Sequence, residues 1–351
     1  MNEQTNQNIL TQHQEKTTFP WVDFVRFLGA FLVVLAHIER WGAGPQWAHT
    51  FYYTISRNGV PLFFLISGYL LLSKQEDLPT FFKKRAARII IPFLVWSIIY
   101  DVQNSNAFAN TGVTFEAILK MFIRILRGPR AGHLWFFYSL IGLYLITPIL
   151  RVFVAKARNS EIIYYIALWF IAVPLLFIVQ GFTPLKNGFE IYYTGGYVGY
   201  FLLGYLLGRL ETKPPLLWSA LGLFIVGFVF TFSVFYFDLP PKDKELVFRV
   251  YTSLNNIIMS LGAFILIKAA GEKISPKLAW LSAEASKVSF GIYLIHPMVF
   301  TGIALGWNAL GFQTAMGNSM LVIPLVTLVN FILSWAIVFL ISKIPILRSV
   351  V

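Results

Sequence analysis

Long apolar stretches alternate with short polar connections along most of the chain. Most are long enough, or nearly so, to cross the ~30 Å hydrocarbon core of a bilayer as one helix. Pro and Gly interrupt several of them, so each end is predicted to within a few residues. The predicted spans lie near 21–39, 57–73, 89–104, 133–151, 162–180, 192–209, 216–236, 250–268, 288–307 and 319–342.

One connection has a different pattern. In the segment FEAILKMFIRIL, apolar residues recur at helical spacing, which predicts an amphipathic helix over 115–127 lying in the membrane interface. Its basic face would contact lipid headgroups or, alternatively, hold phosphates or an anionic acceptor. The apolar positions are Phe115, Ile118, Leu119, Phe122, Ile123 and Leu126.

Composition excludes an ordinary soluble protein. Of the 351 residues, 57% are hydrophobic and 13% are charged, whereas soluble domains carry about 25% charged residues. We therefore predict an all-α integral membrane protein with about ten transmembrane helices. We expect a polar tail at 1–18, one transmembrane domain at 19–345 and no extracytoplasmic domain after it.

Positive charge sets the predicted orientation. If the N-terminus is cytoplasmic, the inner connections carry most of the 28 Lys and Arg residues, as the positive-inside rule requires. Both termini are then cytoplasmic. The chain has no cysteine, which excludes disulfides, thiolate metal sites and a cysteine acyl carrier. We find no metal-ligand spacing and no phosphate-binding loop, so we expect no metal.

Two ionisable residues in the first span are costly in a membrane and call for an explanation. Ten residues without a polar side chain, FLGAFLVVLA, separate Arg26 from His37. Eleven helical steps turn about 1,100°, so both side chains share one face, about 16 Å apart along the axis. Asp23 precedes Arg26 by three residues and can pair with it. Alternatively, Arg26 reaches the inner headgroups and His37 is an interfacial histidine.

Further candidates lie in other spans. His133 and Trp135 begin an aromatic stretch at the outer end of the fourth span, and His296 precedes Pro297 in the ninth. A histidine with its pKa near ~6.5 suits general base chemistry on a hydroxyl. Each histidine is alone in its span, however, so a structural role is at least as plausible as a catalytic one.

Basic residues open the third span. The segment KKRAARIIIPF places Arg85 and Arg88 on one face of a helix, with Lys84 beside them. Guanidinium pairs bind phosphate well, although the same charges also serve to fix topology. In the second span, the small residues Ser67 and Gly68 predict close packing against another helix, and we prefer this interpretation to a nucleophilic role for Ser67. The glycines of 195–210 likewise predict close helix packing.

Together these motifs resemble the membrane-bound acyltransferase 3 family over about residues 20–345. The motifs that carry the resemblance are, in order, the Arg26 and His37 pair, VPLFFLISGYLL, Arg85-x-x-Arg88, HLWFFYSLIGLYLITPIL and FGIYLIHP. The pattern is most similar to bacterial inner-membrane O-acetyltransferases that modify surface polysaccharides, including the enterobacterial common antigen type.

The resemblance implies acetyl-CoA as an acyl donor bound from the cytoplasm. The implied acceptor is a sugar hydroxyl of a surface polysaccharide or lipid-linked glycan. Arg85 and Arg88, with Lys84 nearby, would contact the CoA phosphates. His37 would be the family's essential histidine and Arg26 its essential arginine.

We expect His37 to act as general base in direct transfer, while Arg26, held by Asp23, orients the donor. A covalent acyl-histidine relay is the mechanistic alternative. His133, His296 and Trp135 are expected in a secondary or acceptor site.

A different class of function fits the same segments. Broken helices and charges within the membrane are also typical of transporters. A glycan exporter, or a proton-coupled carrier that uses Arg26 and His37, is therefore the alternative to the enzyme.

Overall fold

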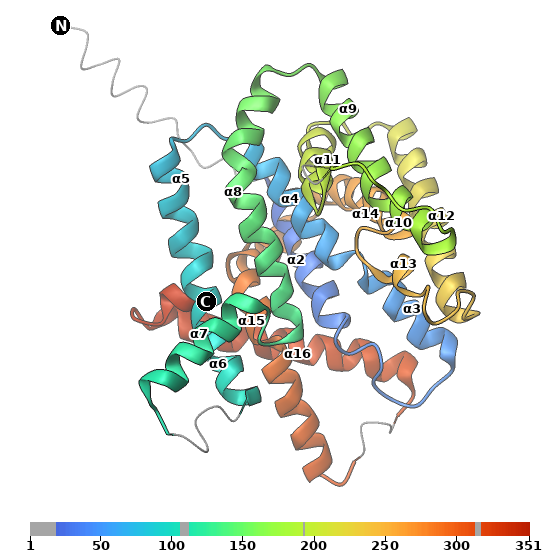
Figure 1. Ribbon diagram of the computed structural model, residues 1–351. Coiled ribbons are helices and arrows are strands. Elements are labelled where there is room, and N and C mark those ends of the chain that lie inside the picture. The colour runs from blue at the N-terminus through green and yellow to red at the C-terminus, as the bar shows by residue number, and fades with distance from the viewer. Residues whose placement is uncertain (1–18, 106–111, 192–193, 313–316) are drawn as a thin grey trace, which may run out of the picture.

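The computed structural model describes residues 19–105, 112–191, 194–312 and 317–351, so the predicted polar tail at 1–18 lies outside it. The described residues form helices and no strand (Figure 1). The helices are α2 (Pro20–Leu35), α3 (Gln46–Ser56), α4 (Gly59–Leu72), α5 (Leu78–Arg85), η1 (Ala86–Ile90), α6 (Ile91–Ser105), α7 (Phe115–Arg127), η2 (Gly132–Leu134), α8 (Trp135–Lys156), α9 (Asn159–Phe170), η3 (Ile171–Leu175), α10 (Leu176–Phe182), α11 (Val198–Gly208), α12 (Pro214–Tyr236), α13 (Leu246–Arg249), α14 (Leu254–Gly271), α15 (Pro276–Ala309), α16 (Ser319–Lys343) and η5 (Arg348–Val350).

Helix α2 lies at the centre of the molecule. It packs against α4, α14, α15 and α16, and apolar residues are buried around most of its circumference. A helix that is apolar on all sides is stable only when other helices or lipid surround it. The long helix α15 runs beside α2, so residues at the end of α2 and in the middle of α15 become neighbours.

Helices α4 and α11 cross at very close range because glycines form the contact. A Cβ atom built on Gly68 would lie 2.1 Å from the carbonyl oxygen of Phe201, and one on Gly204 would lie 1.9 Å from that of Leu65. Only a residue without a side chain fits such an approach. The predicted role of glycine in packing these two segments is therefore confirmed.

Each of the ten predicted apolar stretches contains a helix. Among the described residues, eight helical segments are long and apolar enough to cross a membrane. The other two stretches hold α2, with 16 residues, and α11, with 11, both shorter than a typical span. The all-helical membrane architecture is confirmed, and the count of ten stays a prediction.

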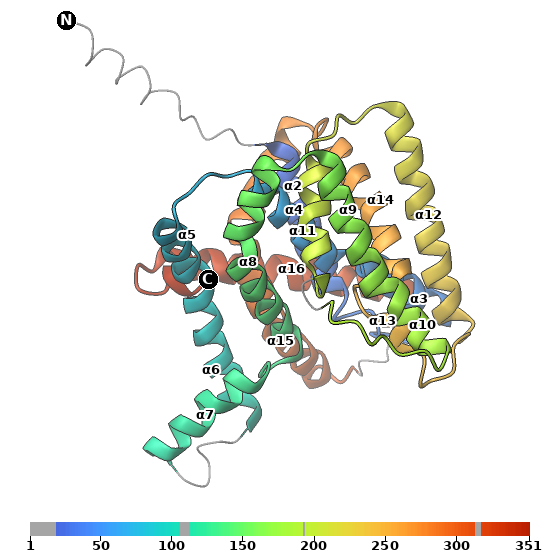
Figure 2. The same cartoon turned by 45° about the horizontal axis from the view of Figure 1, so that its top comes forward.

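The arrangement of the connections bears on the predicted orientation. The start of α2 and the connections α4–α5 and α8–α9 lie together at the upper end of the molecule in Figures 1 and 2. The C-terminal segment η5 instead packs against α6 and α16, and the hydrogen bond from Trp96 Nε1 to the Val350 oxygen, 2.8 Å, fixes it there. A cytoplasmic location of both termini stays a prediction.

The predicted amphipathic helix is α7. Its apolar positions Phe115, Leu119 and Leu126 are exposed, as expected for a helix that contacts lipid, so the interfacial prediction is retained. Its basic face is only partly free, because Arg124 binds the buried carboxylate of Asp101 at 2.6 Å. Arg130 binds the same carboxylate at 2.5 Å, which ties the segment to α6.

We predict that Gly68→Ala lowers the free energy of unfolding in detergent by about 1–3 kcal/mol, because the added methyl group forces α4 and α11 apart. Gly142→Ala in α8 is the matched control, since a Cβ there meets nothing within 4 Å. The control is expected to be neutral or stabilising by up to ~1 kcal/mol. Equal melting temperatures for the two variants would contradict the close crossing.

Candidate active site

Three histidines from distant parts of the chain meet at one point. His37 follows the end of α2, His133 lies in η2, and His296 lies in the middle of α15. The ring centroid of His37 is 4.6 Å from that of His296 and 6.2 Å from that of His133, and the latter two are 5.5 Å apart. No single span contains two of them, so the cluster exists only in the folded chain.

Pro297 determines how His296 is held. Proline has no N–H group, so the carbonyl four residues earlier, that of Tyr293, lacks its usual helical partner. His296 Nδ1 lies 2.8 Å from this carbonyl oxygen and 3.2 Å from that of Ile292. Because a carbonyl can only accept, Nδ1 carries the proton, and His296 Nε2 is left as an acceptor.

His37 is likewise held by hydrogen bonds to one of its ring nitrogens. Its Nδ1 lies 2.8 Å from the Val33 carbonyl oxygen and 3.2 Å from His296 Nε2, so it donates to both acceptors. His37 Nε2 then bears a free lone pair, and no described residue forms a hydrogen bond with it. His37 is exposed, whereas His133 and His296 are buried. The accessible His37 therefore presents an unprotonated Nε2, and its tautomer is fixed by the two hydrogen bonds of Nδ1.

A small cavity of about 130 Å³ lies next to His37. We call it the histidine cavity. Its lining includes His37, Glu39, Arg57, His133, Trp135, Tyr251 and Tyr293.

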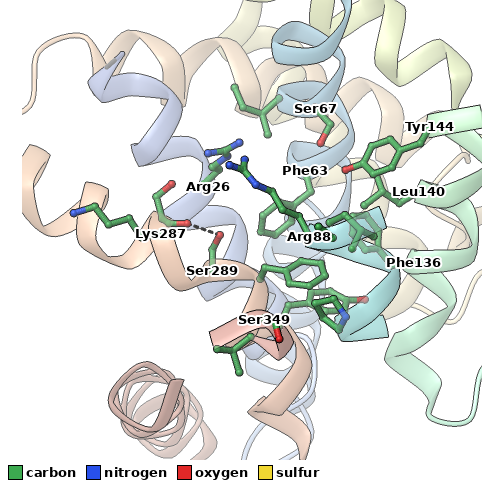
Figure 3. A pocket seen from close by; sticks show the side chains of 18 of the residues that line it. Arg26, Phe63, Ser67, Arg88, Phe136, Leu140, Tyr144, Lys287, Ser289 and Ser349 are labelled. Atoms are coloured by element: carbon green, nitrogen blue, oxygen red, sulfur yellow. Dashed lines mark hydrogen bonds between the residues drawn. The ribbon is translucent and has the colours of Figure 1, made fainter. Parts of the chain in front are cut away.

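A larger cavity of about 640 Å³ lies between α2, α4, η1, α8 and α15. Figure 3 shows Arg26 and Arg88 reaching into it beside Ser67, with Tyr144 on the facing side. We call it the arginine cavity. Its volume lies within the ~300–1,000 Å³ typical of small-molecule sites.

The arginine cavity is strongly basic. Arg26, Arg88, Lys287 and Arg348 line it, and none of the described lining side chains is acidic. The expected pairing of Arg26 with Asp23 is not present: no ion pair within 4.0 Å joins them, although the Asp23 charge still acts on Arg26 at longer range. The cavity thus keeps a cation that is costly in a membrane and that an anion would stabilise.

One aromatic side chain is common to the linings of the two cavities. Tyr293 lines both, and its hydroxyl donates to the His133 carbonyl oxygen at 2.5 Å. Arg26 and His37, predicted on one helix face, therefore lie in different but adjoining cavities.

Comparison with known proteins now adds to this geometry. A family model described as an acyltransferase domain, of the acyltransferase 3 type, matches residues 19–339. The chain belongs to the acyltransferase 3 family. With its apolar helices, this acyltransferase 3 member is a multi-pass membrane protein.

Two curated relatives of this acyltransferase 3 member are informative. An amino-acid racemase of Enterococcus faecalis is 24% identical over 335 residues, which cover 89% of this chain and 45% of that protein. The nodulation protein NolL of Sinorhizobium fredii (strain NBRC 101917 / NGR234) is 31% identical over 140 residues, 37% of this chain and 36% of that protein. The match spans less than half of either relative. No solved structure gives a significant match.

The second arginine of the acyltransferase 3 motif has a different environment from the first. Arg88 lines the arginine cavity, whereas Arg85 pairs with Glu76 at 3.3 Å. Between the two arginines the helix changes to η1, a π-helical turn over Ala86–Ile90 that ends two residues before Pro92. Lys84 also binds Glu76, at 2.7 Å. Among the predicted donor-binding residues, Arg88 thus lines the arginine cavity while Arg85 and Lys84 are paired with Glu76, and a shared face of the two arginines stays a prediction.

Sequence reasoning missed two residues beside His37. Glu39 and Arg57 line the histidine cavity, but the sequence shows them only as charges next to apolar spans. Position just outside a span, within two residues of a candidate base, is the signal that would have found Glu39. Among the described residues, no group of three or more His, Cys, Asp or Glu side chains has the geometry of a metal site.

Glu76 forms ion pairs with Lys84, Arg85 and Arg151, and these ion pairs lead to a prediction about stability and pH. Burial alone would raise the pKa of Glu76, but hydrogen bonds from Lys84 and Arg151 and the charge of Arg85 lower it to about 2. The pKa is depressed on folding, so the stabilisation is complete above about pH 4.5 and is lost as the pH falls toward 2. Glu76→Gln should cost about 1–3 kcal/mol at pH 7 and less at pH 3.

Melting curves at pH 7, 4 and 3 measure this effect. Glu211→Gln is the matched control, because Glu211 and its partner Lys213 are exposed and such pairs contribute about 0–1 kcal/mol. If the melting temperatures of the wild type and Glu76→Gln differ by the same amount at all three pH values, the lowered pKa of Glu76 is contradicted.

Proposed function

We propose that this chain is a membrane O-acetyltransferase that moves an acetyl group from cytoplasmic acetyl-CoA to a sugar hydroxyl of a surface polysaccharide or lipid-linked glycan in the bacterial inner membrane. One observation carries the proposal: an accessible histidine with a fixed tautomer adjoins a basic cavity of ligand size. Family membership supports acyl transfer as the reaction class.

The arginine cavity fits the phosphates of CoA. Arg26 and Arg88 come from different helices and face one space without an acidic side chain in its described lining. Guanidinium groups bind phosphate oxygens through paired, charge-assisted hydrogen bonds. Arg85 and Lys84 are paired with Glu76, so we assign phosphate binding to Arg26 and Arg88 and a structural role to Arg85 and Lys84. The adjoining position of His37 matches a donor whose acyl end extends past Tyr293.

His37 supplies the base. Its Nε2 takes the proton of the acceptor hydroxyl while that oxygen bonds to the thioester carbonyl carbon. The carbon–sulfur bond then breaks, and His37 returns the proton to the departing sulfur. Between these steps the imidazolium is stabilised by Val33 oxygen and His296 Nε2, which both accept from Nδ1.

Arg26 contributes a fixed positive charge and takes no part in proton transfer. Its guanidinium is permanently charged and lies in the cavity without an ion-pair partner within 4.0 Å among the described residues. Such a group, fixed on the central helix, orients an anionic donor and stabilises negative charge that develops during transfer.

We predict that His37→Ala lowers kcat for acetyl transfer by about 10²–10⁴-fold while CoA binding persists. His296→Ala should cause a smaller loss of kcat, because it removes only the acceptor that helps fix His37. Transfer of labelled acetyl from acetyl-CoA by purified protein in nanodiscs measures both. Full activity of His37→Ala would exclude the base mechanism, and accumulation of labelled protein in the wild type would favour an acyl-histidine relay.

Arg88 lines the arginine cavity and Arg85 pairs with Glu76, so substitutions at these two positions form a matched pair of variants. Arg88→Gln should raise KM for acetyl-CoA by roughly tenfold or more, since it removes charge-assisted hydrogen bonds. Arg85→Gln should leave that KM within about threefold and instead lower the melting temperature. The opposite assignment of effects would show that Arg85 contacts the donor.

A further inference from the structure

A separate cavity of about 1140 Å³ is lined by the α4–α5 connection, the second half of α8 and the end of α11. The first two of these segments lie together at the upper end of the molecule in Figures 1 and 2. We call it the α8 cavity. It shares no lining residue with the arginine cavity or the histidine cavity, and no step of the proposed reaction uses it.

The α8 cavity opens toward the lipid-facing side of α8. Leu145, Ile149 and Val152 recur at i, i+4 and i+7, so they lie on one face of this membrane-spanning helix. They are 64%, 66% and 62% exposed, and in a bilayer such apolar side chains are covered by acyl chains. Ile149 and Val152 also line the cavity. An apolar stripe therefore runs along α8 and ends in the cavity.

Arg151 fixes one wall of the α8 cavity. Its Nε donates to the Leu71 carbonyl oxygen at 2.7 Å, and its Nη2 pairs with Glu76 at 3.2 Å. Because Arg151 belongs to α8 while its two partners belong to α4 and the connection after it, these bonds hold the connection against α8. The lining is thereby preorganised, which reduces the conformational entropy that is lost when a ligand binds.

Two cations of the lining are available to a ligand. Lys74, in the α4–α5 connection, and Arg209, just after α11, are exposed and form no ion pair within 4.0 Å among the residues that the structure describes. Arg209 is oriented by Tyr205: it donates to the tyrosine hydroxyl, and its guanidinium lies over the ring, 4.8 Å from the centroid. An anion in the cavity would meet both cations.

The carboxylates of the same cavity are already engaged within the protein. Glu76 has three cationic partners, and Asp77 caps the N-terminus of α5 with a hydrogen bond of 3.0 Å. In the described part of the chain, the cavity lining and the partners of Glu76 together provide five basic and two acidic side chains: Lys74, Lys84, Arg85, Arg151, Arg209, Glu76 and Asp77. The charge of the cavity therefore favours an anion.

We propose that the α8 cavity binds the headgroup of an anionic phospholipid, with the phosphate at Lys74 and Arg209 and the acyl chains along Leu145, Ile149 and Val152. Basic pockets between transmembrane helices bind lipid headgroups in this way. A soluble phosphate would gain nothing from the apolar stripe, and a zwitterionic lipid carries a further positive charge that the two cations repel. The inference does not depend on the function proposed above.

Lipid binding to the purified full chain tests the site. Native mass spectrometry of the protein released from detergent micelles titrates dioleoylphosphatidylglycerol, the anionic probe, and dioleoylphosphatidylcholine, the zwitterionic probe. The first phosphatidylglycerol should bind with a Kd about tenfold or more below that of phosphatidylcholine. It should also raise the melting temperature in detergent, because a ligand of the folded state stabilises that state. Glycerol phosphate is the soluble probe and should not displace phosphatidylglycerol.

Lys74→Gln and Arg209→Gln identify the phosphate ligands. Each removes one cation near the membrane surface, so the Kd for phosphatidylglycerol should rise about fivefold, while that for phosphatidylcholine changes little. Lys156→Gln is the matched control, because it removes an exposed cation at the end of α8 that does not line the cavity. All three side chains are exposed, so the variants are expected to fold.

Three results would overturn the lipid site. Equal Kd values for the two phospholipids would show that charge does not select the ligand. Displacement of phosphatidylglycerol by glycerol phosphate would show a site for soluble phosphates. An equal loss of affinity in Lys156→Gln and in the two cavity variants would show attraction to the overall surface charge. None of these measurements involves acetyl transfer, so the proposed function succeeds or fails separately.

Discussion

The arrangement of the site depends on one missing hydrogen bond inside α15. Since Pro297 cannot donate to the Tyr293 carbonyl, that oxygen is available to His296. The ring of His296 is thereby fixed in one tautomer and accepts from His37, which completes the chain of fixed groups. A missing hydrogen bond inside α15 thus orients His296 and, through it, the accessible His37.

Electrostatics distinguishes the surroundings of Arg26 from those of His37. The arginine cavity has cations without acidic side chains among its described lining residues, whereas an acidic residue, Glu39, and a basic one, Arg57, both line the histidine cavity. In a low-dielectric membrane such differences act strongly, because uncompensated charge is expensive to bury. Adjoining cavities of one protein therefore differ in the charge of the side chains that line them.

Helices and glycine contacts were predictable from sequence, because apolar runs and small residues act locally. Arg26 and His37 were also predictable, since ionisable residues stand out in an apolar span. The meeting of His37 with His296 was not, because 259 residues separate them and only the packing of α2 on α15 brings them together. The different surroundings of Arg85 and Arg88 were hidden as well, since residue spacing does not reveal that Arg85 pairs with Glu76.

The position of Tyr293 has a consequence for the membrane itself. Polar cavities that approach each other from two directions risk becoming a continuous water-filled path, through which protons and ions would leak. Tyr293 is buried between them and is held by its hydrogen bond to the His133 carbonyl oxygen. Because Tyr293 lines both cavities, the position of this one anchored ring limits the width of any passage between them.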